Sequence, residues 1–124
     1  MVDQDPFTGK IIGCAIEVHR VLGPGLLEST YQQCLAYELR LNGIPFKLEQ
    51  PMPVAYKGVR LDCGYRMDVL VDDRLILELK AVEAVNGIHK AQLLTYMKLS
   101  GIKTGLLINF NVPRLVDGIE RFKL

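Results

Sequence analysis

Two short apolar segments joined by an acidic turn, in residues 65–80, most constrain how this chain can fold. Their sequence, YRMDVLVDDRLILELK, is typical of the two strands of a β-hairpin. Side chains alternate between the two faces of a strand, so Glu78 and Lys80 share one face while Leu77 and Leu79 share the other. An acid and a lysine on one face of an apolar strand are unusual for a strand that only builds a core.

The length of the turn decides where Asp68, on the first strand, lies relative to Glu78 on the second. A loop of residues 72–73 would place Asp68 opposite Leu77, on the wrong face, because directly opposite residues share a face. A loop of residues 72–74 places Asp68 opposite Glu78 instead. Such loops favour a glycine, which this turn lacks. We therefore predict an odd-length loop or a bulge.

Two carboxylates at opposite positions repel one another, and like charges there destabilise a sheet. We therefore expect a cation between Asp68 and Glu78, and a hard divalent ion such as Mg²⁺ or Mn²⁺ takes oxygen ligands of this kind. The alternative is that both acids are solvated on an exposed face, with Lys80 as their ion-pair partner. The spacing alone favours neither interpretation.

Length and composition indicate an ordinary globular protein. The 124 residues suffice for a substantial core, so residues 1–124 are predicted to form a single domain. No apolar stretch approaches the length of a membrane span, and the first residues do not resemble a signal peptide. Three cysteines form neither a metal pattern nor a disulfide framework, which predicts buried free thiols: Cys14, Cys34 and Cys63. We expect a cytoplasmic protein without membrane association.

The formal net charge of +1 bears on nucleic-acid binding. Proteins that bind nucleic acid strongly on their own usually carry a clear basic excess. Any contact with nucleic acid would therefore depend on a local basic patch, or on a protein partner that supplies the affinity.

Three helices are predicted, at about residues 8–22, 27–41 and 88–100. The expected buried faces are Ile12, Ala15, Ile16, His19 and Leu22; Leu27, Tyr31, Leu35 and Leu39; and Ile88, Leu93, Tyr96, Met97 and Leu99. Gln92 falls within the third face, and a buried amide without a partner costs about 1–3 kcal/mol. We favour its pointing into a site over a structural role. For His19 we favour a satisfied, half-buried histidine over a ligand.

The remaining segments predict strands. Residues 46–50 and 53–56 are predicted to form one edge strand interrupted by prolines, and residues 59–71 and 75–81 the arms of the central hairpin. The apolar run 104–110 suits a buried strand in parallel pairing through a helical crossover, and residues 118–124 suit an edge. The predicted order is α-α-β-β-β-α-β-β, an α/β fold.

Four motifs in this order resemble the PD-(D/E)XK nuclease superfamily. Asp68 and the triplet Glu78-x-Lys80 match its hairpin motif. The residue before Asp68 is Met67, whereas the motif has proline there. Residues 25–31 match the signature of the GxxExxY family, and residues 92–96 match the QxxxY motif of the RecB-like branch. The resemblance covers about residues 11–122. It implies a restriction-endonuclease-like core, with a mixed sheet of about four to five strands flanked by helices.

The resemblance also implies a role for each motif residue. Asp68 and Glu78 would bind one or two Mg²⁺ ions, with Glu28 as an outer acid that completes the metal site. Lys80 would orient the attacking water and stabilise the developing charge. Gln92 and Tyr96 would position Lys80, the water or the DNA backbone.

These inferences predict a Mg²⁺- or Mn²⁺-dependent nuclease that hydrolyses phosphodiester bonds, and they favour DNA over RNA as its substrate. A basic surface is predicted around the third helix, with Lys90 and Lys98 as nucleic-acid contacts, near Lys80, Lys103 and Arg114. One alternative is a nuclease-like fold that only binds nucleic acid or protein, and another is a structural α/β domain. An exposed edge at residues 46–56 or 118–124 would allow a homodimer.

Overall fold

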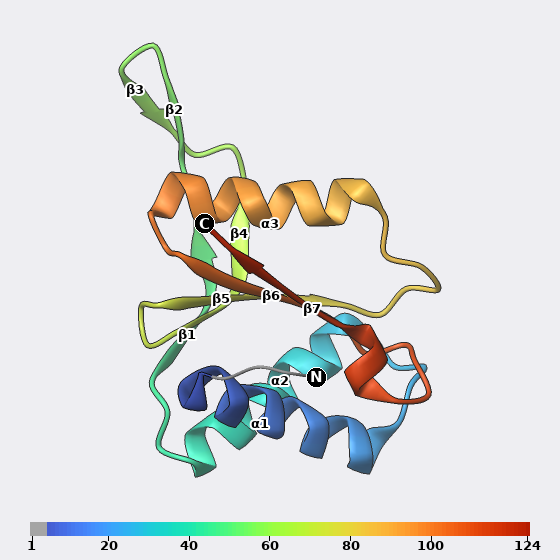
Figure 1. Ribbon diagram of the computed structural model, residues 1–124. Helices are drawn as coiled ribbons and strands as arrows, with labels where there is room; N and C mark the ends of the chain where they lie inside the picture. The colour runs from blue at the N-terminus through green and yellow to red at the C-terminus, as the bar shows by residue number, and fades with distance from the viewer. Residues whose placement is uncertain (1–4) are drawn as a thin grey trace.

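The computed structural model describes residues 5–124 as an α/β fold in which helices cover both faces of a sheet (Figure 1). Its elements, in chain order, are α1 (Pro6–Leu22), α2 (Glu28–Leu41), β1 (Phe46–Pro51), β2 (Val54–Tyr56), β3 (Val59–Leu61), β4 (Arg66–Val71), β5 (Leu75–Lys80), α3 (Gly87–Ser100), β6 (Thr104–Asn109), the 3-10 helix η1 (Leu115–Gly118) and β7 (Ile119–Lys123).

The central sheet has five strands in the order β1-β4-β5-β6-β7. β5 and β6 are parallel and connected through α3, whereas the other neighbouring strands are antiparallel. The predicted mixed sheet is therefore confirmed, and so is the parallel pairing of the apolar run that became β6. β1 and β7 lie at the two edges, as their sequences predicted.

The core forms two layers, one on each face of the sheet. α1 and α2 pack on one face against residues such as Leu77, while α3 packs on the other through Leu93 and Met97 (Figure 1). Alternate residues of β5 belong to different layers, and Ile76 belongs to the α3 layer. Glu78 follows Ile76 by two positions, so it lies on the face that α3 covers.

The segment between β1 and β4 differs from its prediction. Residues 53–56 do not continue β1, and residues 59–71 do not form a single arm. Instead, β2 and β3 pair only with each other, in a separate two-stranded sheet that projects from the body (Figure 1). Pro51 and Pro53 explain the break, because proline has no N–H to extend the ladder. The predicted edge position of the first segment is nevertheless confirmed.

Several residues predicted to be buried are exposed, because each helix contacts the sheet along a narrower stripe than its apolar face. The exposed fractions are 38% for Ile16, 73% for Leu27, 76% for Ile88 and 46% for Leu99. Cys63 is exposed as well. His19 has a hydrogen-bond partner, as predicted, with its Nε2 2.8 Å from the carbonyl oxygen of Val112, but it is buried rather than half-buried. No helix in residues 5–124 is long and apolar enough to cross a membrane.

Candidate active site

The register of the β4–β5 hairpin fixes the position of Asp68. Val69 pairs with Leu77, and the pairing leaves residues 72–74 as a three-residue loop. The first two loop residues have φ values of 51° and 53°, in the left-handed region that aspartate tolerates better than most residues do. The predicted odd-length loop is confirmed, and the same register places Asp68 opposite Glu78.

Asp68 and Glu78 lie side by side where the ladder between β4 and β5 ends. The carboxylate of Asp68 accepts a hydrogen bond from the backbone N–H of Leu79 at 2.8 Å. The backbone N–H of Asp68 in turn lies 3.5 Å from Oε1 of Glu78. Glu78 is only 3% exposed, and Asp68 is half-buried. The alternative of two acids solvated on an open face is therefore wrong.

Burial raises the pKa of both carboxyl groups. For Glu78, burial and then the neighbouring charge of Asp68 raise the pKa to about 8. For Asp68, burial raises the pKa to about 6, against the hydrogen bond from Leu79. The charge of Lys80 lowers both pKa values but does not cancel the effect of burial. The pair therefore holds a proton near neutral pH unless a further cation takes its place.

The backbone around Lys80, the last residue of β5, is fixed on both sides. Its carbonyl oxygen accepts a hydrogen bond from the N–H of Phe110 at 2.8 Å. The buried side chain of Asn109 donates to the carbonyl oxygen of Val82 at 2.9 Å and accepts from the N–H of the same residue at 3.1 Å. These hydrogen bonds fix the backbone at the end of β5, and so they hold the charged side chain of Lys80 beside the two acids.

Glu28 enters the site from the first residue of α2. Tyr31 anchors this helix end: its hydroxyl donates to the carbonyl oxygen of Gly23 at 2.6 Å, and its ring stacks on Phe110 with centroids 4.3 Å apart. The carboxylate of Glu28 accepts from the N–H of Ala81 at 3.4 Å. Tyr31 is therefore structural, and it anchors the helix end that holds Glu28 beside the end of β5.

A cleft of about 300 Å³ between α2 and the sheet is lined by three polar residues that the sequence prediction missed, Ser29, Gln32 and Glu49. Gln32 donates from its amide to the carbonyl oxygen of Asp68 at 2.9 Å and to the carboxylate of Glu49 at 2.7 Å. Gln32 follows Glu28 by four positions, so a helical wheel would have placed both on one face. No sequence signal indicated Glu49, whose φ of 50° breaks the strand pattern of β1.

On the opposite side of the sheet, Gln92 and Tyr96 contact each other across one turn of α3. The Gln92 amide donates to the Tyr96 hydroxyl at 2.6 Å. Burial raises the pKa of that hydroxyl, and the charges of Glu78 and Asp68 raise it further. Tyr96 therefore lies close enough to the paired acids to be affected by their charges, and Gln92 is hydrogen-bonded to it. The site roles of Gln92 and Tyr96 stay predictions.

The predicted nucleic-acid contacts, Lys90 and Lys98, differ in their surroundings. Lys90 forms an ion pair with Glu120 of β7 at 3.0 Å, whereas Lys98 is exposed on the last turn of α3. Both roles stay predictions, and the Lys90–Glu120 pair makes Lys98 the better candidate for a phosphate contact.

The paired acids fit a hydrated divalent cation. Among residues 5–124, no three His, Cys, Asp or Glu side chains form a group that could hold a metal ion. Mg²⁺, however, keeps several waters and is usually bound through one or two carboxylates. Asp68 and Glu78 supply two, their burial disfavours two unpaired charges, and Glu28 borders the same cleft as Asp68. The role of Glu28 as a further metal-site acid stays a prediction.

Comparison with known protein families matches residues 5–122 to the PD-(D/E)XK nuclease superfamily. The matched region contains every element of the fold except the last residue of β7, together with the paired acids and Lys80. Comparisons with curated proteins and with solved structures find no match. The family match covers nearly the whole chain, and the mixed sheet agrees with a restriction-endonuclease-like fold. The chain therefore belongs to the PD-(D/E)XK nuclease superfamily.

Proposed function

We propose that this protein is a Mg²⁺- or Mn²⁺-dependent nuclease that hydrolyses phosphodiester bonds of DNA. The observation that carries the proposal is the buried pair of Asp68 and Glu78 on one hairpin, with Lys80 beside it. Membership of the superfamily supports nuclease activity. The choice of DNA over RNA, the identity of the ion and a cytoplasmic location belong to the proposal.

We assign the chemistry to these residues as follows. Asp68 and Glu78 hold the ion, which when bound lowers the pKa of water and polarises a phosphoryl oxygen. Lys80 donates hydrogen bonds to the attacking water and to a non-bridging phosphate oxygen, so its charge offsets the charge that develops there. The water oxygen bonds to phosphorus and gives up one proton to bulk water, the bond to the leaving oxygen breaks, and that oxygen takes a proton from bulk water.

Three further residues position this centre. From the α3 side, Gln92 and Tyr96 position Lys80, the attacking water or the DNA backbone. From the α2 side, Glu28 borders the cleft as a further acid of the metal site. Their spacing supports a finer placement in the GxxExxY family and the RecB-like QxxxY branch. Gly25 and Glu28 belong to the first motif, which ends at the buried Tyr31.

The first test is Mn²⁺ binding by calorimetry to the wild type, Asp68→Asn and Glu78→Gln. We expect binding by the wild type and its loss in both variants, because each removes one carboxylate ligand. Cleavage of labelled DNA with Mg²⁺ or Mn²⁺ should fall by roughly 10²–10³-fold in the same variants.

A matched control is Asp73→Asn, which removes an exposed acid from the hairpin loop and keeps a residue type that tolerates positive φ. This variant should bind Mn²⁺ and cleave DNA like the wild type. A wild type that binds no Mn²⁺ at millimolar concentration would refute the proposed activity.

A second candidate function is a non-catalytic module that binds nucleic acid or protein. The lack of a three-ligand metal cluster in the described part of the chain favours it, and so does the net charge of +1. Under this function a protein partner would supply the affinity for DNA. Metal binding without cleavage, together with DNA affinity that appears only with a partner, would support it. A homodimer through an edge strand stays a proposal for either function.

A further inference from the structure

A groove of about 510 Å³ runs along the outer side of α3, between this helix and the stem of the β2–β3 hairpin. On the helix side it is lined by Ile88 and Leu99, which the sheet leaves 76% and 46% exposed. Met52, Val54 and Tyr65 line the other side. The apolar residues of α3 that are exposed against expectation thus belong to one continuous surface.

This groove adjoins the candidate active site. Gln92 and Tyr96 line it, and Tyr96 also packs in the core layer that contains Met67, the neighbour of Asp68 in the sequence. The rings of Tyr65 and Tyr96 lie 6.3 Å apart at an angle of 69°. A molecule in the groove would therefore lie directly beside the residues that flank the paired acids.

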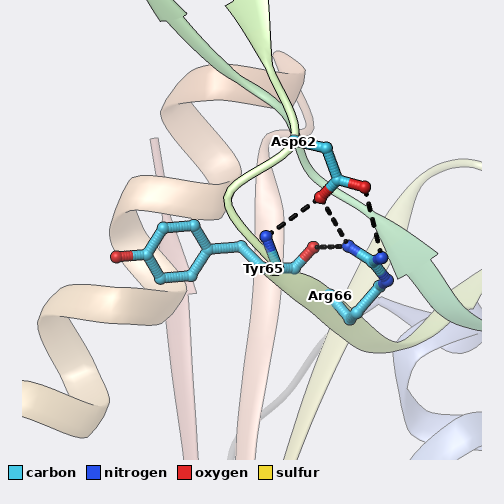
Figure 2. Close-up of polar contacts among 4 residues, drawn as sticks. Asp62, Tyr65 and Arg66 are labelled. Atoms are coloured by element: carbon cyan, nitrogen blue, oxygen red, sulfur yellow. Dashed lines mark hydrogen bonds and ion pairs between the residues drawn. The ribbon is translucent and has the colours of Figure 1, made fainter.

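The ring of Tyr65 is held in place by contacts of its own loop. The carboxylate of Asp62 accepts from the N–H of Gly64 at 2.9 Å and from Nη1 of Arg66 at 3.2 Å. Arg66 also donates to the carbonyl oxygen of Tyr65 at 2.8 Å. Figure 2 shows the ring of Tyr65 pointing away from these contacts, and Tyr65 is 46% exposed. The loop thus presents a flat aromatic surface whose backbone is already fixed.

The two elements on either side of the groove carry basic residues but no acids, although the residues that line the groove itself are uncharged and Asp62 follows the hairpin directly. The β2–β3 hairpin, residues 54–61, contains Lys57 and Arg60 but no aspartate or glutamate, and α3 likewise contains Lys90 and Lys98 but no acid. The whole chain has nearly equal numbers of the two charges, 15 basic and 14 acidic residues. Lys90 is paired with Glu120, so the other three basic residues remain to face a polyanion.

We propose that this groove binds the bases of an unpaired nucleic-acid strand, with Tyr65 as the stacking platform. The inference rests on the proposed function and names its substrate class, which is single-stranded or locally unpaired nucleic acid. Bases have apolar faces for the groove and polar edges for Gln92 and Thr95, which line it. A duplex hides its base faces, and a second copy of the chain would not require acid-free elements on both sides of the groove.

The test is fluorescence anisotropy with a labelled 12-nucleotide oligothymidylate and with a blunt duplex, both in EDTA so that nothing is cleaved. We expect the wild type to bind the single strand at least about tenfold more tightly than the duplex. Tyr65→Ala should weaken binding of the single strand about tenfold, because it removes one stacked base contact. The control Tyr37→Ala changes a tyrosine of α2 that is 58% exposed, and should bind like the wild type.

A second pair of variants guards against effects on folding. Ile88→Glu places a negative charge in the groove and should weaken binding of the single strand, whereas Leu41→Glu places one on α2 and should not. Both residues are exposed, at 76% and 62%, so neither change disturbs the core. Equal affinity for both DNA forms, or identical results for Tyr65→Ala and Tyr37→Ala, would overturn the inference. So would a dimer that Ile88→Glu dissociates, because the groove would then belong to a second copy.

These outcomes separate the inference from the proposed function, because binding in EDTA does not depend on hydrolysis. A wild type that binds the single strand through Tyr65 but never cleaves it with Mg²⁺ or Mn²⁺ supports the groove and refutes the nuclease. A wild type that cleaves both DNA forms equally, with Tyr65→Ala unchanged, supports the nuclease and refutes the groove.

Discussion

At the scale of single residues, Glu78 shows how the fold stores electrostatic energy at the candidate site. Its side chain is almost fully buried on the α3 face of the sheet, beside a second acid. The folded state raises its pKa to about 8, from an ordinary value of 4.5. A raised carboxyl pKa means that the folded protein prefers the protonated acid. The free energy of unfolding is therefore highest, as far as Glu78 is concerned, below pH 4.5, where the acid is protonated in both states. It falls as the pH rises towards 8.

The metal-free protein should accordingly lose stability between pH 5 and pH 9, by roughly 2–4 kcal/mol, because one pKa unit corresponds to about 1.4 kcal/mol. Glu78→Gln should lose less over the same interval and be more stable than the wild type at pH 9. Urea denaturation at both pH values measures the difference. Glu83→Gln, at an exposed position, should follow the wild type. Parallel pH curves for Glu78→Gln and the wild type would contradict this prediction.

Sequence reasoning located the central residues of the site but not their neighbours. Asp68 and Glu78 could be placed opposite each other by counting, because strand alternation and loop length leave few choices. Gln32 could also have been found, four positions after Glu28, but a lone glutamine in a helix sequence does not by itself indicate a site. Glu49 could not, since its left-handed backbone depends on packing between β1 and its neighbours that no local pattern encodes.

At the scale of secondary-structure elements, the β2–β3 hairpin is an addition to a simpler motif. β1 and β4 form an antiparallel pair up to Pro51 and Arg66, and the N–H of Met52 donates to the carbonyl oxygen of Tyr65 at 2.9 Å. A tight turn could join the two strands at that point. The twelve residues 53–64 instead form an inserted hairpin. Within the described structure, its two strands pair with each other and not with the central sheet.

Replacing residues 53–64 by Asn-Gly should therefore leave the domain folded. Asn-Gly favours the two-residue turn that suits an antiparallel pair, and the exposed β3 contributes little burial. The free energy of unfolding should stay within about 1 kcal/mol of the wild type, because loop length has a weak effect on stability. Urea denaturation measures this value. A loss of several kcal/mol would show that the hairpin supports the core.

Helices and strands were predictable from the sequence where the pattern of apolar residues follows which side chains are buried. The apolar run of β6 is buried between two layers, and its sequence indicated both the strand and the parallel pairing. The β2–β3 hairpin has no buried face, so its alternation gives no signal about its partner. The apolar face of α3 was predicted too wide for a similar reason. Residues such as Ile88 line a groove, and periodicity does not distinguish a groove from a core.

At the scale of the whole molecule, charge is balanced overall but unevenly distributed. The cleft beside α2 is lined by Glu28, Glu49 and Asp68, whereas the charged residues of α3 are two lysines and no acid. An uneven charge distribution produces a local electrostatic potential. That potential can attract an anionic strand to one side of a protein whose net charge is only +1.

Salt dependence of DNA binding should reveal that uneven distribution. Lys98→Gln should reduce the slope of log affinity against log salt by about 0.7–0.9, the value for one lost phosphate contact. Lys90→Gln should reduce it less, because Glu120 already pairs with Lys90. Anisotropy titrations at several salt concentrations measure the slope, with Lys10→Gln on α1 as the control. An unchanged slope for Lys98→Gln would remove this residue from the DNA surface.

The short loop of the β4–β5 hairpin has a consequence for how the protein acquires its site. Asp68 and Glu78 are only ten positions apart, and hairpins of this size close within about 1–10 μs, well before distant segments meet. The two acids therefore meet early during folding, before α2 or α3 can shield them. Their repulsion opposes that early step, and a divalent cation in the surrounding solution would relieve it. The ion that serves the finished protein could thus also speed its formation.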